Sequence, residues 1–305
     1  MFDAGGHIRR TSGIGNPECR DLPFPPYPDP AVPGSVNQHA IDTIPQSGEL
    51  PGSLRKGIEV MKPDIFFPDM RLRNATDKER MERADADLDQ LHRTIRQFHW
   101  INLLFSASRS LMRKHFFPMM EQVPTRSYTL LDVGAGGCDN AVWAAREARN
   151  RGLKLSITAL DSDPRILPVA YRAVRDYPEI RIFEGNALDF SELGSFDFIF
   201  SNHFLHHLDW DEIKIFLLQV LARTRIAFVM NDLKRSRLAY LGCTVLLGIG
   251  TRRSFACHDG QLSIRRGFLP RELRDFTTKN FPNARIQVVE TSPARVVLFG
   301  HTGRT

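Results

Sequence analysis

Residues 130–139 read LLDVGAGGCD, an apolar run that turns abruptly into an acidic, glycine-rich loop. The run at 128–133 has the length and apolarity of a short buried strand. Gly134 and Gly136 would allow the tight turn and close backbone approach that a ligand needs at a strand-to-helix junction. We therefore expect a nucleotide-containing cofactor here, and a following helix that Asp139 caps. Glycines that serve turn geometry alone are the simpler alternative.

The flanking sequence alternates between strand-like and helix-like segments. Strands are predicted at 155–160, 180–184, 196–201 and 226–231, and helices at 140–150, 164–175, 211–221 and 270–278. Strands separated by helices of this length imply right-handed crossovers and a mostly parallel sheet covered on both faces. The predicted class is thus a Rossmann-like, doubly wound α/β fold. In such sheets, ligands bind outside the carboxyl ends of the strands.

Polar residues suited to one ligand follow several of these strands. Asp161 comes 29 residues after Asp132, where a carboxylate can accept both hydroxyls of a ribose. Residues 184–189, EGNALD, offer an amide or carboxylate to an adenine amino group, and residues 201–208, SNHFLHHL, follow the next strand. Each has a structural alternative, since Asp161 could simply cap a helix. Their joint order and spacing favour a ligand site.

These motifs resemble the class I S-adenosylmethionine-dependent methyltransferases, over about residues 128–298. The resemblance implies a seven-stranded sheet and S-adenosylmethionine as the cofactor. Carried over residue by residue, it implies a cofactor site made of Asp132, Gly134, Ala135, Gly136, Asp161, Ser162, Asn186, Ala187 and Asn202. Two positions depart from the family pattern: Cys138 stands at the third glycine position, and Asn186 at the usual third-motif aspartate. The amide oxygen of Asn186 can still accept from an adenine amine.

A dinucleotide-dependent oxidoreductase is the competing nucleotide interpretation. Its glycine motif places a pyrophosphate over a helix N-terminus. Here the loop leads to Asp139, which would repel a pyrophosphate. S-adenosylmethionine carries no phosphate and has a positive sulfonium, so an acidic loop suits it better.

His203 follows the fourth strand most closely and is our candidate for a general base, with pocket lining as the equal alternative. The segment 233–268 is expected to be a substrate-side insertion, and the substrate-side candidates are His207, Asp232, Arg235 and His258. Its pattern is similar to a bacterial subgroup related to quinone-biosynthesis methyltransferases, which implies a phenol-, quinone- or polyketide-like acceptor methylated on oxygen or activated carbon. The Asn/Asp-Pro-Pro-aromatic element typical of adenine and glutamine methylation is missing at 201–204.

Composition limits the partners. The 305 residues are 42% hydrophobic with a net charge of +6, and basic and acidic residues alternate through most of the chain, so we expect no nucleic-acid partner. The four cysteines form no CxxC pair and have no histidine at metal-ligand spacing, so we expect neither disulfides nor a metal site, and a cytoplasmic location. The apolar run 238–249 is too short to span a bilayer; a lid, peripheral membrane contact and core packing remain open.

The domain organisation follows from composition shifts. Eleven of the 19 prolines lie between Pro17 and Pro68, which predicts a proline-rich disordered arm over 1–75. A helical cap is expected at 76–125, with helices at 77–98 and 100–117, and the methyltransferase domain at 126–305. The acceptor is expected to be a small apolar molecule. The alternatives are an RNA or protein methyltransferase and a non-catalytic S-adenosylmethionine-binding regulatory protein.

Overall fold

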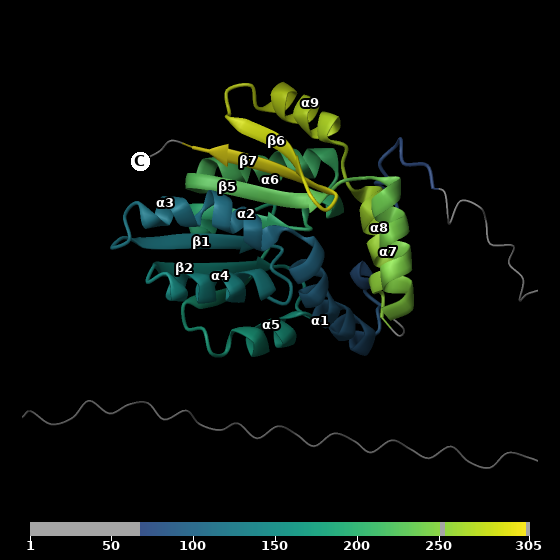
Figure 1. Cartoon of the computed structure of the whole chain (residues 1–305), viewed down its shortest axis with the longest axis horizontal. Coiled ribbons are helices and arrows are strands. Elements are labelled where there is room, and N and C mark those ends of the chain that lie inside the picture. The colour runs from purple at the N-terminus through teal and green to yellow at the C-terminus, as the bar shows by residue number, and fades with distance from the viewer. Residues whose placement is uncertain (1–67, 251–253, 303–305) are drawn as a thin grey trace, which may run out of the picture. The chain divides into compact units, whose positions relative to one another are not determined.

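The computed structural model describes residues 68–250 and 254–302 (Figure 1). Its centre is a seven-stranded sheet with the strand order β3-β2-β1-β4-β5-β7-β6. The strands are β1 Ser127–Val133, β2 Lys154–Asp161, β3 Ile180–Glu184, β4 Phe196–Asn202, β5 Thr224–Leu233, β6 Ile286–Thr291 and β7 Arg295–His301. Strands β1 to β5 pair in parallel, whereas β7 runs antiparallel to both neighbours, β5 and β6. The predicted doubly wound, mostly parallel fold is confirmed.

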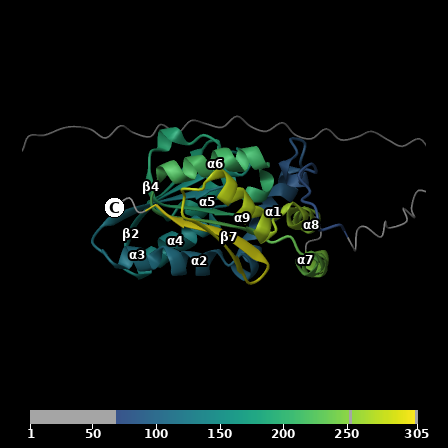
Figure 2. The same cartoon turned by 90° about the horizontal axis from the view of Figure 1, so that it is seen from above.

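Helices cover both faces of this sheet. The α-helices are α1 Leu88–Phe105, α2 Ser108–His115, α3 Phe117–Glu121, α4 Asp139–Asn150, α5 Leu167–Val174, α6 Trp210–Arg223, α7 Arg237–Gly250, α8 Ala256–Arg266 and α9 Pro270–Asn280. Short 3-10 helices lie at η2 Arg80–Glu82, η3 Ser191–Leu193 and η4 Leu205–His207. Helices α2, α3 and α4 lie on one face and α6 on the other (Figure 2).

The central strands alternate between two cores, as expected for a sheet buried on both faces. Leu130 of β1 and Phe198 of β4 pack toward α2, α3 and α4. Their chain neighbours Leu131 and Ile199 pack toward α6 and α9. Every residue of β4 is buried. The two cores hold the carboxyl ends of β1, β2 and β4 in fixed register, and these ends carry the predicted ligand motifs.

The helices before β1 differ from the prediction. The helix expected at 77–98 begins only at Leu88, because Asp87 caps it by accepting from the Gln90 amide. It then continues without a break to Phe105, so the expected division near residue 99 was wrong. The break comes at Ala107, whose φ of 57° cannot continue a right-handed helix. The expected arm at 1–75 lies almost wholly outside the described residues.

Helices α7 and α8 pack side by side at the end of the sheet where α1 also lies (Figure 1). One side of α7 packs into a small core, in which the buried Tyr240 lies with Ile264 of α8, whereas Leu238 is 83% exposed and Val245 is 60% exposed. Within the described residues, no helix is both long and apolar enough to cross a membrane.

Candidate functional site

A cavity of about 860 Å³ opens at the carboxyl ends of β1, β2 and β4. One wall consists of the glycine loop 134–137 and residues 161–163 after β2. The opposite wall comes from η2, α1, η4, α7 and α8, including Glu79, His207 and Leu238. This volume is near the upper end of the range usual for ligand pockets. The cavity therefore joins the predicted cofactor loop to the predicted substrate-side insertion.

The glycine loop takes a left-handed backbone at three positions. Gly134 and Gly136 have φ of 67° and 53°, and Cys138, at the missing third glycine position, has φ of 62°. The amides of Gly134 and Ala135 both donate to the Leu160 carbonyl, at 2.9 and 3.1 Å, which anchors the loop to β2. The residue before α4 is Cys138, so Asp139 is the first helical residue rather than the expected cap.

Asp161 lies where a ribose site was predicted. Its Oδ2 accepts from the Gly136 amide at 2.7 Å and its Oδ1 from the Asp163 amide at 3.0 Å. Each carboxylate oxygen has two lone pairs and Asp161 lines the cavity, so the carboxylate can accept further hydrogen bonds there. Burial raises the pKa of Asp161 above that of an ordinary aspartate. The side chain thus holds the loop and can also bind a diol.

Asp132 supports the loop from beneath and does not line the cavity. The carboxyl group is completely buried and accepts from the backbone amide of Ala141 in α4. Burial, followed by the nearby charges of Asp139 and Asp161, raises its pKa well above the usual value. Its Oδ2 has no partner among the described residues. The carboxyl groups of Asp139 and Asp161 do line the cavity beside this loop, which fits a cation such as a sulfonium and disfavours a phosphate.

The third and fourth motifs lie at the same cavity. Ala187 lines it, whereas Asn186 is exposed and its Oδ1 accepts from the Leu188 amide at 2.9 Å. Asn202 lines the cavity and donates to Asn102 of α1 at 3.2 Å. Ser162 also lines it. Seven of the nine predicted cofactor residues therefore line the cavity, whereas the buried Asp132 and the exposed Asn186 do not.

Comparison with known proteins bears on this arrangement. Residues 130–225 match the sequence pattern of a family described as a methyltransferase domain. This segment is a methyltransferase domain. It contains the glycine loop, Asp161, Ala187 and the Asn202 segment, which are the elements that build the first wall of the cavity.

Two solved structures show the same fold. Human N-acetylserotonin methyltransferase, in complex with S-adenosylmethionine, has a TM-score of 0.50 at 13% identity, covering 71% of this chain and 57% of the human one. The plantazolicin methyltransferase BpumL, in complex with S-adenosylhomocysteine and a pentazolic desmethylPZN analogue, has a TM-score of 0.51 at 12% identity. The match covers 68% of this chain and 90% of BpumL. No curated protein sequence matches the chain. The fold and the acidic loop of this domain fit S-adenosylmethionine as the cofactor.

On the substrate side of the methyltransferase domain, His203 lines the cavity beside Arg295 of β7. The Nη1 of Arg295 donates to the Nε2 of His203, and its Nε donates to the Phe105 carbonyl at 2.7 Å. Burial and the adjacent guanidinium hold the pKa of His203 well below its usual value, so the imidazole is neutral. An Nε2 that accepts from arginine lacks a free lone pair. This geometry favours pocket lining over general base catalysis for His203.

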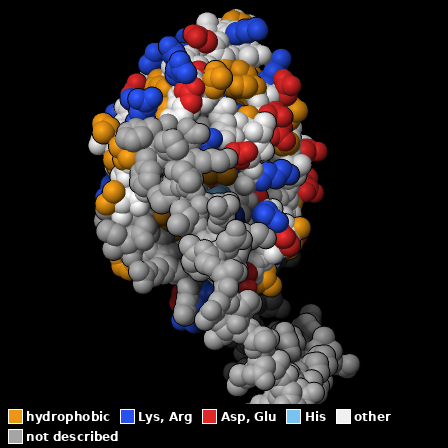
Figure 3. Space-filling view, turned by 90° about the vertical axis from the view of Figure 1, so that its right-hand side faces the viewer, with side chains coloured by type: hydrophobic (Ala, Val, Ile, Leu, Met, Phe, Trp, Pro, Cys, Tyr) orange, Lys and Arg blue, Asp and Glu red, His pale blue; other side chains and the backbone are white. Residues whose placement is uncertain are grey.

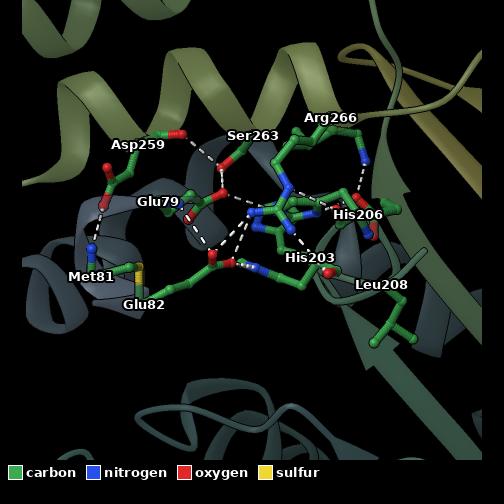
Figure 4. A network of polar contacts seen from close by, with 12 residues as sticks. Glu79, Met81, Glu82, His203, His206, Leu208, Asp259, Ser263 and Arg266 are labelled. Atoms are coloured by element: carbon green, nitrogen blue, oxygen red, sulfur yellow. Dashed lines mark hydrogen bonds and ion pairs between the residues drawn. The ribbon is translucent and has the colours of Figure 1, made fainter. Parts of the chain in front are cut away.

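His206 and His207 meet a pair of glutamates at the opposite wall, and Figure 4 shows His206 there with Glu79 and Glu82. The Nδ1 of His206 contacts Asp232 at 2.7 Å, and its Nε2 lies 3.5 Å from Glu79. The Nδ1 of His207 is hydrogen-bonded to Glu82. Although burial opposes its charge, the flanking carboxylates raise the pKa of His206 to about 9.

The other substrate-side candidates lie away from the cavity. Asp232 is fully buried, and its carboxylate is hydrogen-bonded to the Nδ1 of His206. Arg235 is buried and donates to the Met70 and Gly267 carbonyls at 3.0 and 2.6 Å, so it anchors the chain before η2. His258 pairs with Asp259 at 3.0 Å and lines a second, smaller pocket.

Sequence reasoning missed several polar residues of the cavity wall, among them Glu79, Glu82, Asn102 and Arg295. They lie outside the matched segment 130–225, on elements that flank the methyltransferase domain in the chain. Neither Glu79 nor Glu82 stands in a recognisable motif; they reach the site because Asp259 of α8 accepts from the amides of Arg80 and Met81, at 2.9 and 3.0 Å. Only the tertiary structure reveals them.

Proposed function

We propose that the chain transfers the methyl group of S-adenosylmethionine to oxygen or activated carbon of a small, apolar, phenol-, quinone- or polyketide-like acceptor. The observation that supports this most is the single cavity, in which the wall of the methyltransferase domain faces a wall of different chemistry. A cofactor on one wall and an acceptor on the other would face each other, which is the arrangement that an in-line transfer requires.

The proposed cofactor roles follow the geometry of the first wall. Asp161 accepts the ribose hydroxyls, Ala187 and the Asn186 backbone flank the adenine, and Gly134 to Gly136 pass beneath the methionine part. The bound cofactor supplies a methyl group activated by a positive sulfur. Asp139 and Asp161, whose carboxyl groups line the cavity beside the glycine loop, stabilise that positive charge before transfer.

The proposed acceptor side is mostly apolar. It consists of side chains from η2, α1, α7 and α8: Met81, Ile95, Phe98, Ile101, Phe105, Leu238 and Ile264. Such walls bind rings and alkyl chains through burial of apolar surface. His203, Arg295 and His207 provide polar groups at its edge, suited to the oxygen of a phenol or quinone.

Macromolecular acceptors have less support. On the face shown in Figure 3, Lys and Arg are interspersed with Asp and Glu wherever described side chains are visible, and no continuous basic surface appears there. A nucleic-acid groove needs clustered basic side chains with aromatic stacking residues. An RNA or protein acceptor, and a non-catalytic cofactor-binding protein, are therefore outcomes that the following experiment must separate.

The test is transfer of labelled methyl from S-adenosylmethionine to a panel of phenols, naphthoquinols and β-diketones, with bulk RNA and protein in parallel. We expect transfer to at least one small acceptor. Phe98→Ala should raise the acceptor KM by roughly tenfold, since contact between an aromatic ring and an aromatic acceptor contributes about 0.5–1.5 kcal/mol, while leaving cofactor affinity unchanged. Leu241→Ala, on the exposed side of α7, is the matched control. Cofactor binding without any transfer would favour the regulatory alternative, and transfer to RNA alone would overturn the proposal.

A further inference from the structure

We propose that Glu79, His206 and His207 form a binding site for one divalent transition-metal ion at the acceptor wall of the cavity. Their donor atoms all lie within 4.8 Å of one another. All three side chains line the cavity, so the ion would have open coordination positions toward it. Two imidazoles and one carboxylate with open positions are a set found in catalytic zinc and non-haem iron sites.

The two histidines are oriented in the same way, with the Nδ1 of each ring against a carboxylate. The Asp232 carboxylate fixes His206 twice, through Nδ1 at 2.7 Å and through the backbone amide at 3.1 Å. Glu82 accepts from the Nδ1 of His207. In each ring Nε2 is left for another partner. A carboxylate on the distal nitrogen is the usual arrangement behind metal-binding histidines, because it fixes the ring orientation and increases the basicity of the ligand.

The supporting residues are themselves anchored. Arg266 of α8 donates to both oxygens of Glu82, at 2.9 and 3.1 Å, and to the carbonyls of His206 and His207, at 3.0 and 2.9 Å (Figure 4). Ser263 donates to Oε1 of Glu79 at 2.5 Å. The site therefore rests on η2, η4, β5 and α8 together, so the three donors are pre-organised rather than carried on one mobile segment.

The spacing fits an ion better than direct pairing. The Nε2 of His206 and the Oε1 of Glu79 are 3.5 Å apart, which is long for a hydrogen bond between charged groups. Donors about 2.1 Å from a tetrahedral ion are separated by about 3.4 Å, so this pair already has the right separation. His207 supplies the third donor, which lies within 4.8 Å of the other two.

The donor types limit which ion binds. Magnesium and calcium prefer sites made only of oxygen ligands, whereas imidazole suits zinc, iron, cobalt and nickel. We therefore assign the site to an ion of the zinc class. Its use rests on the proposed function: an ion here would bind the acceptor oxygen and favour its deprotonated form, which supplies the nucleophile without requiring His203 as a base.

The test uses the tag-free, full-length chain, stripped with a chelator and titrated with Zn²⁺ and, separately, with Co²⁺ as a spectroscopic probe. We expect about one ion per chain, and visible cobalt bands typical of nitrogen and oxygen ligands. His207→Ala and Glu79→Gln should each weaken binding at least tenfold, and Glu82→Gln should weaken it about tenfold through ring orientation. His301→Ala, an exposed histidine on β7, is the control.

Failure of wild-type protein to bind Zn²⁺ or Co²⁺, or equal binding by His207→Ala, overturns the metal site. Circular dichroism of each variant checks that the fold is kept, and His207 is partly exposed, so its truncation should be tolerated. The proposed function is measured separately. If wild-type protein binds no metal after chelation but still transfers methyl groups, the metal site is refuted and the proposed function stands. If the protein binds metal but methylates no small acceptor, the proposed function is refuted and the metal site stands.

Discussion

The substitution Asp161→Asn separates cofactor binding from loop support. Both carboxylate oxygens already accept one backbone amide, from Gly136 at 2.7 Å and from Asp163 at 3.0 Å. Asparagine keeps the size of the side chain but replaces one acceptor oxygen with an NH2 donor. One of the two proposed ribose hydrogen bonds is then lost. A hydrogen bond to a charged group contributes about 1.5–3 kcal/mol, so the Kd for S-adenosylmethionine should rise roughly ten- to hundredfold.

The same substitution has a cost for folding. The NH2 group must face one of the two backbone N–H donors, which loses its partner, so the free energy of unfolding of the cofactor-free protein should fall by about 1–3 kcal/mol. Calorimetric titration with cofactor, combined with urea unfolding, measures both effects. Asp163→Asn is the matched control, because the Asp163 carboxylate is held by Arg165 at 2.7 Å. A Kd for Asp161→Asn within twofold of wild type, or an equal loss of affinity in Asp163→Asn, would refute the ribose role.

Three further outcomes are expected. Since burial raises the pKa of Asp161 and its ionised form accepts the ribose hydroxyls, cofactor affinity should decline as the pH falls, beginning above the ordinary aspartate pKa of about 3.9, and calorimetry of Asp161→Asn should show a flatter profile. His203→Gln, which retains an acceptor for Arg295, should keep kcat within tenfold, whereas a loss of about 100-fold or more would identify a general base. Arg235→Met should lower the free energy of unfolding by about 3–5 kcal/mol because it leaves buried carbonyls and Glu272 unpaired, while the exposed Arg71→Met changes it by no more than about 0.5 kcal/mol.

The sequence predicted the sheet well because its signals are local. Strand β3 matched the prediction at both ends, and β1, β2, β4 and α4 to within a residue or so, since apolar runs bounded by turn residues define them. The start of α1 was misplaced by some ten residues. Its true boundary depends on the Asp87 cap, and the apolar periodicity continues upstream of that cap into residues that pack without forming an α-helix.

The cofactor wall was predictable for the same reason: its residues sit at the ends of predicted strands. The acceptor wall was not. Arg235 carries a charge in the predicted insertion and was taken for a substrate contact, yet it is buried against the Met70 carbonyl, more than 160 residues away in the chain. Glu79 and Arg295 reach the cavity only through such long-range contacts, which leave no local pattern.

The short stretch through η2 has an evolutionary consequence. It supplies Glu79, Met81 and Glu82 to the acceptor wall, and it is held by Asp259 of α8 and by Arg165, which donates to the Met81 carbonyl at 3.0 Å. Because these side chains lie on the acceptor wall, substitutions in this stretch can change which acceptor binds. The residues of the proposed cofactor wall stay the same.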